Sequence, residues 1–135
     1  MKKNILLLLF ILFKVFTFAQ VNEIEIITEK DVQNFIQNIM QINDEMQKKK
    51  LLTFDENLFI ENDETDAILR KFGIEGSNPC EKTKIITYCF LYQSIIDNIG
   101  ILDNKNLKVL ENKINQQALS IINNYMEEYY SIYGK

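Results

Sequence analysis

The stretch from 79 to 99 constrains the fold more than any other part of this sequence. Asn78, Pro79 and Glu81 fit a helix N-cap, a proline at the first helical position and a glutamate at the third. The helix predicted after them has apolar residues on most of its sides: Ile85, Ile86, Cys89, Phe90, Leu91, Tyr92, Ile95, Ile96 and Ile99. Such a helix lies inside a bundle or crosses a membrane, and its polar residues, Lys82 among them, argue against a membrane. We therefore expect a buried central helix over about 79–99.

The spacing of apolar residues predicts one more long helix on each side. Over about 28–50, Thr28 and Asp31 have the spacing of a capping box, and three lysines at 48–50 suit the negative end of the helix dipole. One face of this helix holds Val32, Phe35, Ile36, Ile39, Met40 and Met46. Over about 104–133, a continuous apolar stripe holds Leu107, Leu110, Ile114, Ala118, Ile121, Ile122, Tyr125, Tyr129 and Ile132. At about 1.5 Å per residue, a single helix over this range spans about 45 Å.

The region between the first two long helices is predicted to hold one or two short helices within 54–72. A compact helix over 63–72 turns three apolar residues inward: Ile68, Leu69 and Phe72. Gly73 ends this helix, because glycine adopts the left-handed conformation at little cost, and Ile74 can make the hydrophobic contact of such a cap.

Few residues in this chain interrupt helices, since it has one proline and four glycines. No internal repeat and no linker rich in glycine, serine or proline divides it. The sequence therefore predicts a single all-α domain over 20–135. Its architecture is a small helical bundle of three main helices (about 28–50, 79–99 and 104–133) and one or two short helices within 54–72.

The first nineteen residues have the pattern of a secretory signal peptide. Lys2 and Lys3 precede an apolar run over 5–13, and Thr17 and Ala19 are the small residues at positions −3 and −1 of a cleavage site. The run is shorter than the roughly 20 residues that cross a bilayer, and no cysteine follows it to carry a lipid anchor. We expect residues 1–19 to be cleaved and the mature chain to be exported to the periplasm or the cell exterior, without membrane association.

Several catalytic designs are excluded because the chain has no histidine. A Ser-His-Asp or Cys-His nucleophile system and a paired-histidine zinc motif both need one. Two cysteines alone do not make a four-ligand zinc site, and no glycine-rich phosphate loop is present. We expect a protein that is not an enzyme and that uses no cofactor and no metal. A hydrolase built on paired carboxylates is a remote alternative, because the spatial pairing of acids is not visible in a sequence.

The charge balance argues against a nucleic-acid partner. Cleavage of the signal removes Lys2, Lys3 and Lys14, which leaves 12 basic against 19 acidic residues and changes the net charge from −4 to −7. A generic nucleic-acid binder needs a basic stripe instead.

Cys80 and Cys89 raise the question of a disulfide in an exported protein. Nine residues along a helix place the two Cα atoms about 13 Å apart on opposite faces, and a disulfide needs less than about 7 Å. We therefore expect two unpaired, half-buried cysteines. An intramolecular bridge is one alternative and requires a different helix start. The other is a reactive or intermolecular Cys80, whose pKa the helix dipole, Lys82 and Lys84 would lower.

Six acids and no basic residue lie between positions 55 and 66: Asp55, Glu56, Glu61, Asp63, Glu64 and Asp66. A calcium loop that starts at Asn62 fails, because Ala67 stands where the loop needs glycine and Phe72 lies near the place of its last acid. The simpler interpretation is a solvated face with acids at the start of the helix over 63–72. The alternative is a docking surface for a basic partner, which would use Asp63, Glu64 and Asp66.

Four tyrosines crowd the end of the chain: Tyr125, Tyr129, Tyr130 and Tyr133. Tyrosine is frequent at interfaces because its ring buries a large apolar area while its hydroxyl can still form hydrogen bonds with water. The simpler interpretation is that these rings cover the end of the bundle. Met126, Tyr130 and Tyr133 lie on a side distinct from the apolar stripe, so part of the cluster is expected to be exposed. These three residues are the first candidates for partner binding.

Together these features favour a small exported protein that binds another protein, such as a basic one. An inhibitor, an immunity-type protein or an adaptor would fit this description. This hypothesis depends on shape and charge alone. The second hypothesis is a carrier that holds a small apolar molecule in the bundle core beside the helix over 79–99. A surface of evenly mixed charge without an exposed aromatic cluster would count against the first, and an apolar cavity would favour the second.

Overall fold

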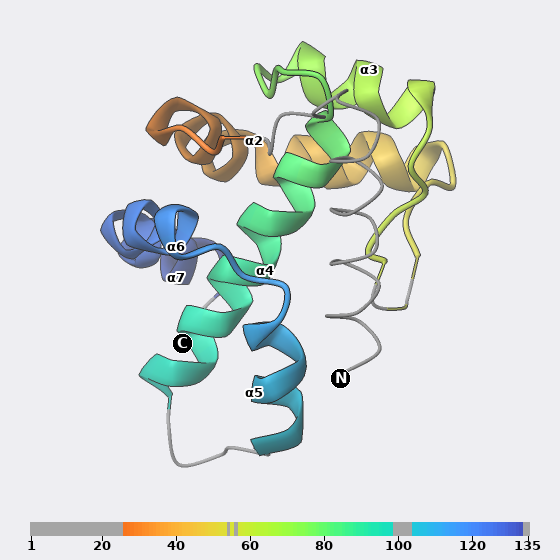
Figure 1. Ribbon diagram of the computed structural model, residues 1–135. Helices are drawn as coiled ribbons and strands as arrows, with labels where there is room; N and C mark the ends of the chain where they lie inside the picture. The colour runs from red at the N-terminus through yellow and green to blue at the C-terminus, as the bar shows by residue number, and fades with distance from the viewer. Residues whose placement is uncertain (1–25, 54, 56, 99–103, 134–135) are drawn as a thin grey trace, which may run out of the picture.

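The computed structural model describes residues 26–53, 55, 57–98 and 104–133, and the predicted signal peptide over 1–19 lies outside these ranges. All regular secondary structure within them is helical (Figure 1): α2 (Glu29–Lys48), α3 (Asp63–Lys71), α4 (Pro79–Asp97), α5 (Asn104–Glu111), α6 (Gln116–Ile122), the 3-10 turn η1 (Asn123–Tyr125) and α7 (Met126–Tyr133). One antiparallel bridge joins Leu52 and Phe59 between α2 and α3. The prediction of a small all-α bundle is confirmed.

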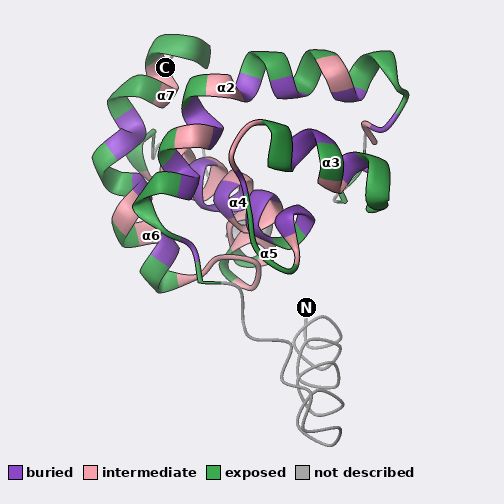
Figure 2. Cartoon of the chain, turned by 90° about the horizontal axis from the view of Figure 1, so that it is seen from above, coloured by how far each residue is buried: buried purple, intermediate pink, exposed green. Residues whose placement is uncertain are grey.

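Helix α4 lies at the centre of the molecule (Figure 2). Asn78 caps it by accepting the amide of Glu81 at 3.0 Å, and Pro79 occupies the first turn. Helices α2, α3, α5, α6 and α7 all pack against it, and Ile86 and Phe90 are almost fully buried. The predicted central helix is confirmed. Of the helices in the described part of the chain, none combines the length and hydrophobicity needed to cross a membrane.

Helix α2 carries the capping box that the sequence predicts. The hydroxyl of Thr28 accepts the amide of Asp31 at 3.1 Å, and the Asp31 carboxylate accepts the amide of Thr28 at 2.9 Å. The buried face of α2 holds Val32, Phe35, Ile36, Ile39, Ile42 and Met46. Met40, which the sequence placed on this face, is exposed instead. It follows Ile39 directly and is therefore rotated by about 100° away from it.

Helix α3 ends as predicted, at a glycine in the left-handed conformation. Gly73 has a φ of 86°. The amides of Gly73 and Ile74 donate to the carbonyls of Arg70 and Leu69, both at 3.0 Å, which is the hydrogen-bond pattern of a Schellman motif. Ile74 is completely buried, so the turn at the end of α3 is anchored in the core.

The last part of the chain is not the single helix that the apolar stripe predicts. Helix α5 ends at Glu111, and Asn115 starts α6 by accepting the amides of Gln117 and Ala118 at 2.9 and 3.1 Å. The prediction of one rod of about 45 Å over 104–133 is wrong, because the helix is interrupted over 112–115. An unbroken rod would extend well past α4, whose 19 residues span only about 28 Å. The break lets α5 lie along α4 while Ala118 and Ile122 turn into the core (Figure 1).

A buried ion pair joins the start of α2 to α4. Lys82 Nζ lies 3.0 Å from Asp31 Oδ2, and the two side chains are 9% and 7% exposed. In the sequence, Lys82 counts among the polar residues that argue against a membrane-spanning helix. Its position four residues before Ile86 places it on the inner face of α4, beside Asp31.

Candidate functional site

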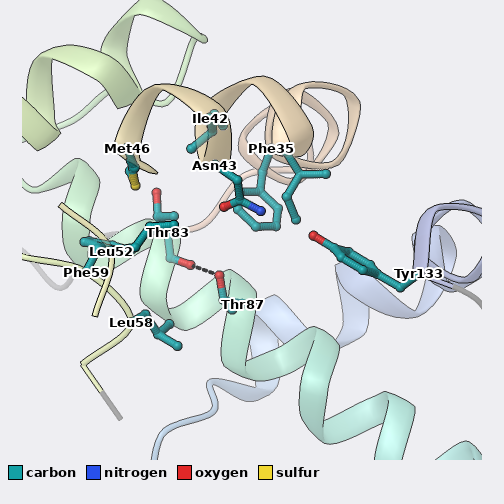
Figure 3. A pocket seen from close by; sticks show the side chains of 11 residues that line it. Phe35, Ile42, Asn43, Met46, Leu52, Leu58, Phe59, Thr83, Thr87 and Tyr133 are labelled. Carbon is teal, nitrogen blue, oxygen red and sulfur yellow. Dashed lines mark hydrogen bonds between the residues drawn. The ribbon is translucent and has the colours of Figure 1, made fainter. Parts of the chain in front are cut away.

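A pocket opens between α2, α4, the connection that follows α2 and the end of α7 (Figure 3). Its volume is about 170 Å³. Eleven residues line it: Phe35, Ile39, Ile42, Asn43, Met46, Leu52, Leu58, Phe59, Thr83, Thr87 and Tyr133. Seven of them are apolar, and none is a lysine, arginine, aspartate, glutamate or cysteine. The lining thus offers apolar surface, hydroxyl groups and one amide.

Two elements supply the apolar wall of the pocket. Helix α2 contributes four apolar lining residues at intervals of three and four, which keeps them on one face. The connection after α2 folds back on itself, because Leu52 bridges to Phe59 and the amide of Thr53 donates to the carbonyl of Leu58 at 2.9 Å. Leu58 has a φ of 68°, a left-handed conformation that costs a residue with a Cβ roughly 1–2 kcal/mol. Its side chain is one of those that line the pocket.

Tyr133 lies at the mouth of the pocket and is 47% exposed. In Figure 3 its hydroxyl points toward the side chains of Phe35 and Asn43 on α2. Burial raises the pKa of Tyr133, and its hydrogen bond with Asn43 opposes that shift, so the hydroxyl is neutral at pH 7. The Tyr133 ring packs on Tyr129 at 5.0 Å, and Tyr129 stacks on Phe90 at 4.9 Å. These contacts tie the mouth of the pocket to the core.

Helix α4 contributes two threonines, one turn apart, to the pocket. The hydroxyl of Thr87 donates to the carbonyl of Thr83 at 2.8 Å, as Figure 3 shows. Thr83 itself is 2% exposed, and its hydroxyl has no hydrogen-bond partner within the described ranges. Buried polar groups nearly always have a partner, so Thr83 is an exception that the site must explain.

The two cysteines are unpaired, as predicted, but both are fully buried and not half-buried. The thiol of Cys80 donates to the carboxylate of Asp66 at 3.0 Å. Burial raises the pKa of Cys80 to about 12, and the negative charges of Asp66 and Glu61 add to the shift. Burial also raises the pKa of Cys89. The alternative of a reactive Cys80 with a lowered pKa is wrong, because these effects outweigh the nearby positive charge of Lys84.

Lysines from other elements offset part of the acidic run between 55 and 66. Glu64 pairs with Lys49 at 2.7 Å, and Glu61 pairs with Lys84. Exposed pairs of this kind add little to stability. They do reduce the negative charge that a docking surface for a basic protein would present, so this face is mixed in charge.

The three acids proposed for docking have different environments. Asp63 and Glu64 are exposed in the first turn of α3, whereas Asp66 is half-buried and holds the Cys80 thiol. Among the residues that the structure describes, no group of three acidic or thiol side chains could hold a metal ion. Partner binding by Asp63, Glu64 and Asp66 stays a prediction.

Of the three candidate residues at the end of the chain, Tyr133 is exposed and the other two are not. Tyr130 is half-buried, and its hydroxyl donates to Asp97 at 2.6 Å; burial and this bond raise its pKa to about 12. Met126 is 7% exposed and packs in the core. The prediction that part of this cluster is exposed is thus met by Tyr133. Met126 is turned inward after η1, since a 3-10 turn has three residues per turn and rotates the following residues relative to an α-helix.

Sequence reasoning identified Phe35, Ile39 and Met46 as core residues but did not find the pocket beside them. It also missed Thr83 and Thr87. A signal was present, since two threonines four residues apart interrupt one face of a helix that is otherwise strongly apolar.

No protein-family model, curated protein or solved structure matches this chain. The function therefore has to be inferred from the chemistry of the chain's own residues.

Proposed function

We propose that this chain is an exported, non-enzymatic binding protein that holds a small, mainly apolar molecule in the pocket between α2 and α4. The observation that carries the proposal is the pocket itself, with its seven apolar lining residues and its opening beside Tyr133. Spaces between the helices of a bundle are common sites for ligands. The lining contains no carboxylate, amine or thiol. It therefore offers groups for binding and none of the side chains that usually act as general acid, general base or nucleophile in a hydrolase.

The volume limits the size of the molecule. Pockets for drug-sized ligands measure about 300–1,000 Å³, whereas an apolar cavity of about 150 Å³ binds benzene. A pocket of about 170 Å³ belongs to the second class. The ligand is therefore a molecule with about one ring, or an aliphatic molecule of similar volume.

Binding of a basic protein, the function that the sequence favoured, has less support. Glu61 and Glu64 are paired with lysines, and one of the three candidate residues at the end of the chain is exposed. An acidic surface attracts a basic partner through its uncompensated charge. Protein binding remains a second hypothesis, to be tested at Asp63 and Glu64.

A titration with benzene tests the proposal. We expect saturable shifts in the amide NMR signals of Phe35, Thr87 and Tyr133, and an increase in melting temperature that grows with benzene concentration, because a ligand of the folded state stabilises it. The variant Thr87→Leu adds apolar volume to the pocket wall and should weaken benzene binding at least about tenfold, since overpacking leaves no room for the ring.

Thr87→Val is the matched control. It removes the same hydroxyl without adding volume and should keep the benzene affinity of the unchanged protein. A spectrum that does not respond to benzene, or a Thr87→Leu variant that binds benzene as well as Thr87→Val does, would contradict the proposal.

A further inference from the structure

The hydroxyl of Thr83 is the polar group of the pocket wall that the fold leaves unsatisfied. Thr83 lines the pocket, is 2% exposed and finds no hydrogen-bond partner among the residues that the structure describes. A hydroxyl taken out of water without a partner lowers the stability of a protein. A ligand with a hydrogen-bond acceptor for the Thr83 hydroxyl would remove this cost, and the free energy recovered would add to the affinity of the ligand.

Thr87 provides an internal comparison. A threonine within a helix can satisfy its hydroxyl with the carbonyl four residues back, and Thr87 does this with Thr83 at 2.8 Å. Thr83 lies on the same face, one turn earlier, and does not make the equivalent bond. The donor proton of Thr87 is therefore used within the helix, whereas that of Thr83 remains available to another molecule.

The charge of the lining restricts the ligand further. All eleven lining residues are neutral at pH 7, because ten have no ionisable side chain and the pKa of Tyr133 is raised above its ordinary value of 10.0. A carboxylate or an ammonium group placed among them would lose its hydration without gaining a counter-charge, which is strongly unfavourable. The pocket therefore selects against ions of either sign.

We infer that the ligand of this pocket is a neutral molecule of about one ring that carries an oxygen atom, as an alcohol, a phenol or a carbonyl compound does. The hydroxyl of Thr83 donates a hydrogen bond to that oxygen, and the apolar part of the molecule packs on Ile39, Met46 and Phe59. This inference depends on the proposed function, since it specifies the chemistry of the molecule that the same pocket holds.

Calorimetric titration with phenol, benzene and benzoate tests the inference on the unchanged protein and on Thr83→Val. Valine has nearly the shape of threonine, so the pocket keeps its volume. We expect Thr83→Val to weaken phenol binding about fivefold to tenfold, the effect of one neutral hydrogen bond, and to leave benzene binding unchanged. Benzoate should bind at least about tenfold more weakly than phenol.

Thr83→Ser serves as the control. It keeps a hydroxyl at position 83 and should keep the phenol affinity within about twofold. A Thr83→Ser variant that loses phenol affinity as much as Thr83→Val does would contradict the role of the hydroxyl.

The possible failures are distinguishable. If none of the three compounds binds, the proposed function fails together with the inference. If benzene binds and Thr83→Val weakens phenol and benzene equally, or neither of them, the proposed function stands and the role of Thr83 is refuted. Benzoate binding as tight as phenol binding would refute the preference for neutral molecules.

Discussion

Cys80 illustrates how neighbours from other elements override the effect of a residue's place in its own helix. A first-turn thiol gains from the helix dipole, which lowers its pKa. In the folded protein, Cys80 is 2% exposed and donates to Asp66 on α3. Burial and the two nearby carboxylates raise its pKa to about 12. The dipole is visible in a sequence, whereas the position of Asp66 across the α3–α4 contact is not.

This raised pKa predicts a loss of stability at alkaline pH. The thiol has a pKa of 9.0 without these neighbours and about 12 in the folded protein, so the unfolded chain releases the proton first. The stabilising contribution is complete below pH 9 and is lost as the pH rises toward 12. Its slope is at most about 1.4 kcal/mol per pH unit. Urea unfolding at pH 8, 9, 10 and 11 measures it.

Cys80→Ala isolates the contribution of this thiol, because Cys89 and the tyrosines with raised pKa values still titrate in the variant. The free energy of unfolding should fall less steeply above pH 9 in Cys80→Ala than in the unchanged protein. Parallel pH profiles for the two proteins would show that Cys80 does not titrate as described.

The end of α2 shows strain that one substitution should remove. The amides of Lys50 and Leu51 donate to the carbonyls of Gln47 and Met46 at 3.0 and 2.8 Å, which is the Schellman pattern also seen after α3. Lys50 occupies the position that glycine favours, with a φ of 58°. We expect Lys50→Gly to stabilise the protein by about 0.5–1 kcal/mol, since relief of strain exceeds the entropy that glycine adds to the unfolded chain. Urea unfolding measures the change.

Gly73→Ala is the opposite case and serves as the comparison. Gly73 has a φ of 86°, and a Cβ atom there would lie 2.5 Å from Nδ2 of Asn34, whose side chain donates to the Gly73 carbonyl. Gly73→Ala should therefore lower the free energy of unfolding by more than about 1 kcal/mol. If both substitutions change stability in the same direction, the backbone conformation is not the cause.

Elements that depend on local chemistry were predictable, and elements that depend on their partners were not. The helix starts at Thr28 and Asn78 and the end at Gly73 follow from side chains within three or four residues of each terminus. The cap at Asn115 is local too, but the apolar stripe continues through it and favours one uninterrupted helix. The pocket depends on how the connection after α2 packs beside Thr83.

At the scale of the whole molecule, the Lys82–Asp31 pair connects α2 and α4 through two residues that are 51 positions apart in the chain. Charges are costly to bury, and a pair of this kind stabilises a fold only while both partners are present. Asp31 also accepts two hydrogen bonds from Thr28. After removal of Lys82, these two bonds still stabilise the charge of the Asp31 carboxylate. We expect Lys82→Met to lower the free energy of unfolding by about 3 kcal/mol, at the low end for broken buried pairs.

A more exposed pair two residues later provides the control for this expectation. The side chains of Lys84 and Glu61 are 18% and 48% exposed, so water screens the pair and Lys84→Met should cost only about 1 kcal/mol. In a double-mutant cycle, Lys82→Met combined with Asp31→Asn should be less destabilising than the sum of the two single changes, because no unpaired charge remains buried. Equal costs for Lys82→Met and Lys84→Met in urea unfolding, or an additive cycle, would mean that the charge pair does not fix α2 against α4.

The pocket lies between these helices, so a loosened α2–α4 contact in Lys82→Met should also weaken benzene binding, whereas Lys84→Met should preserve it.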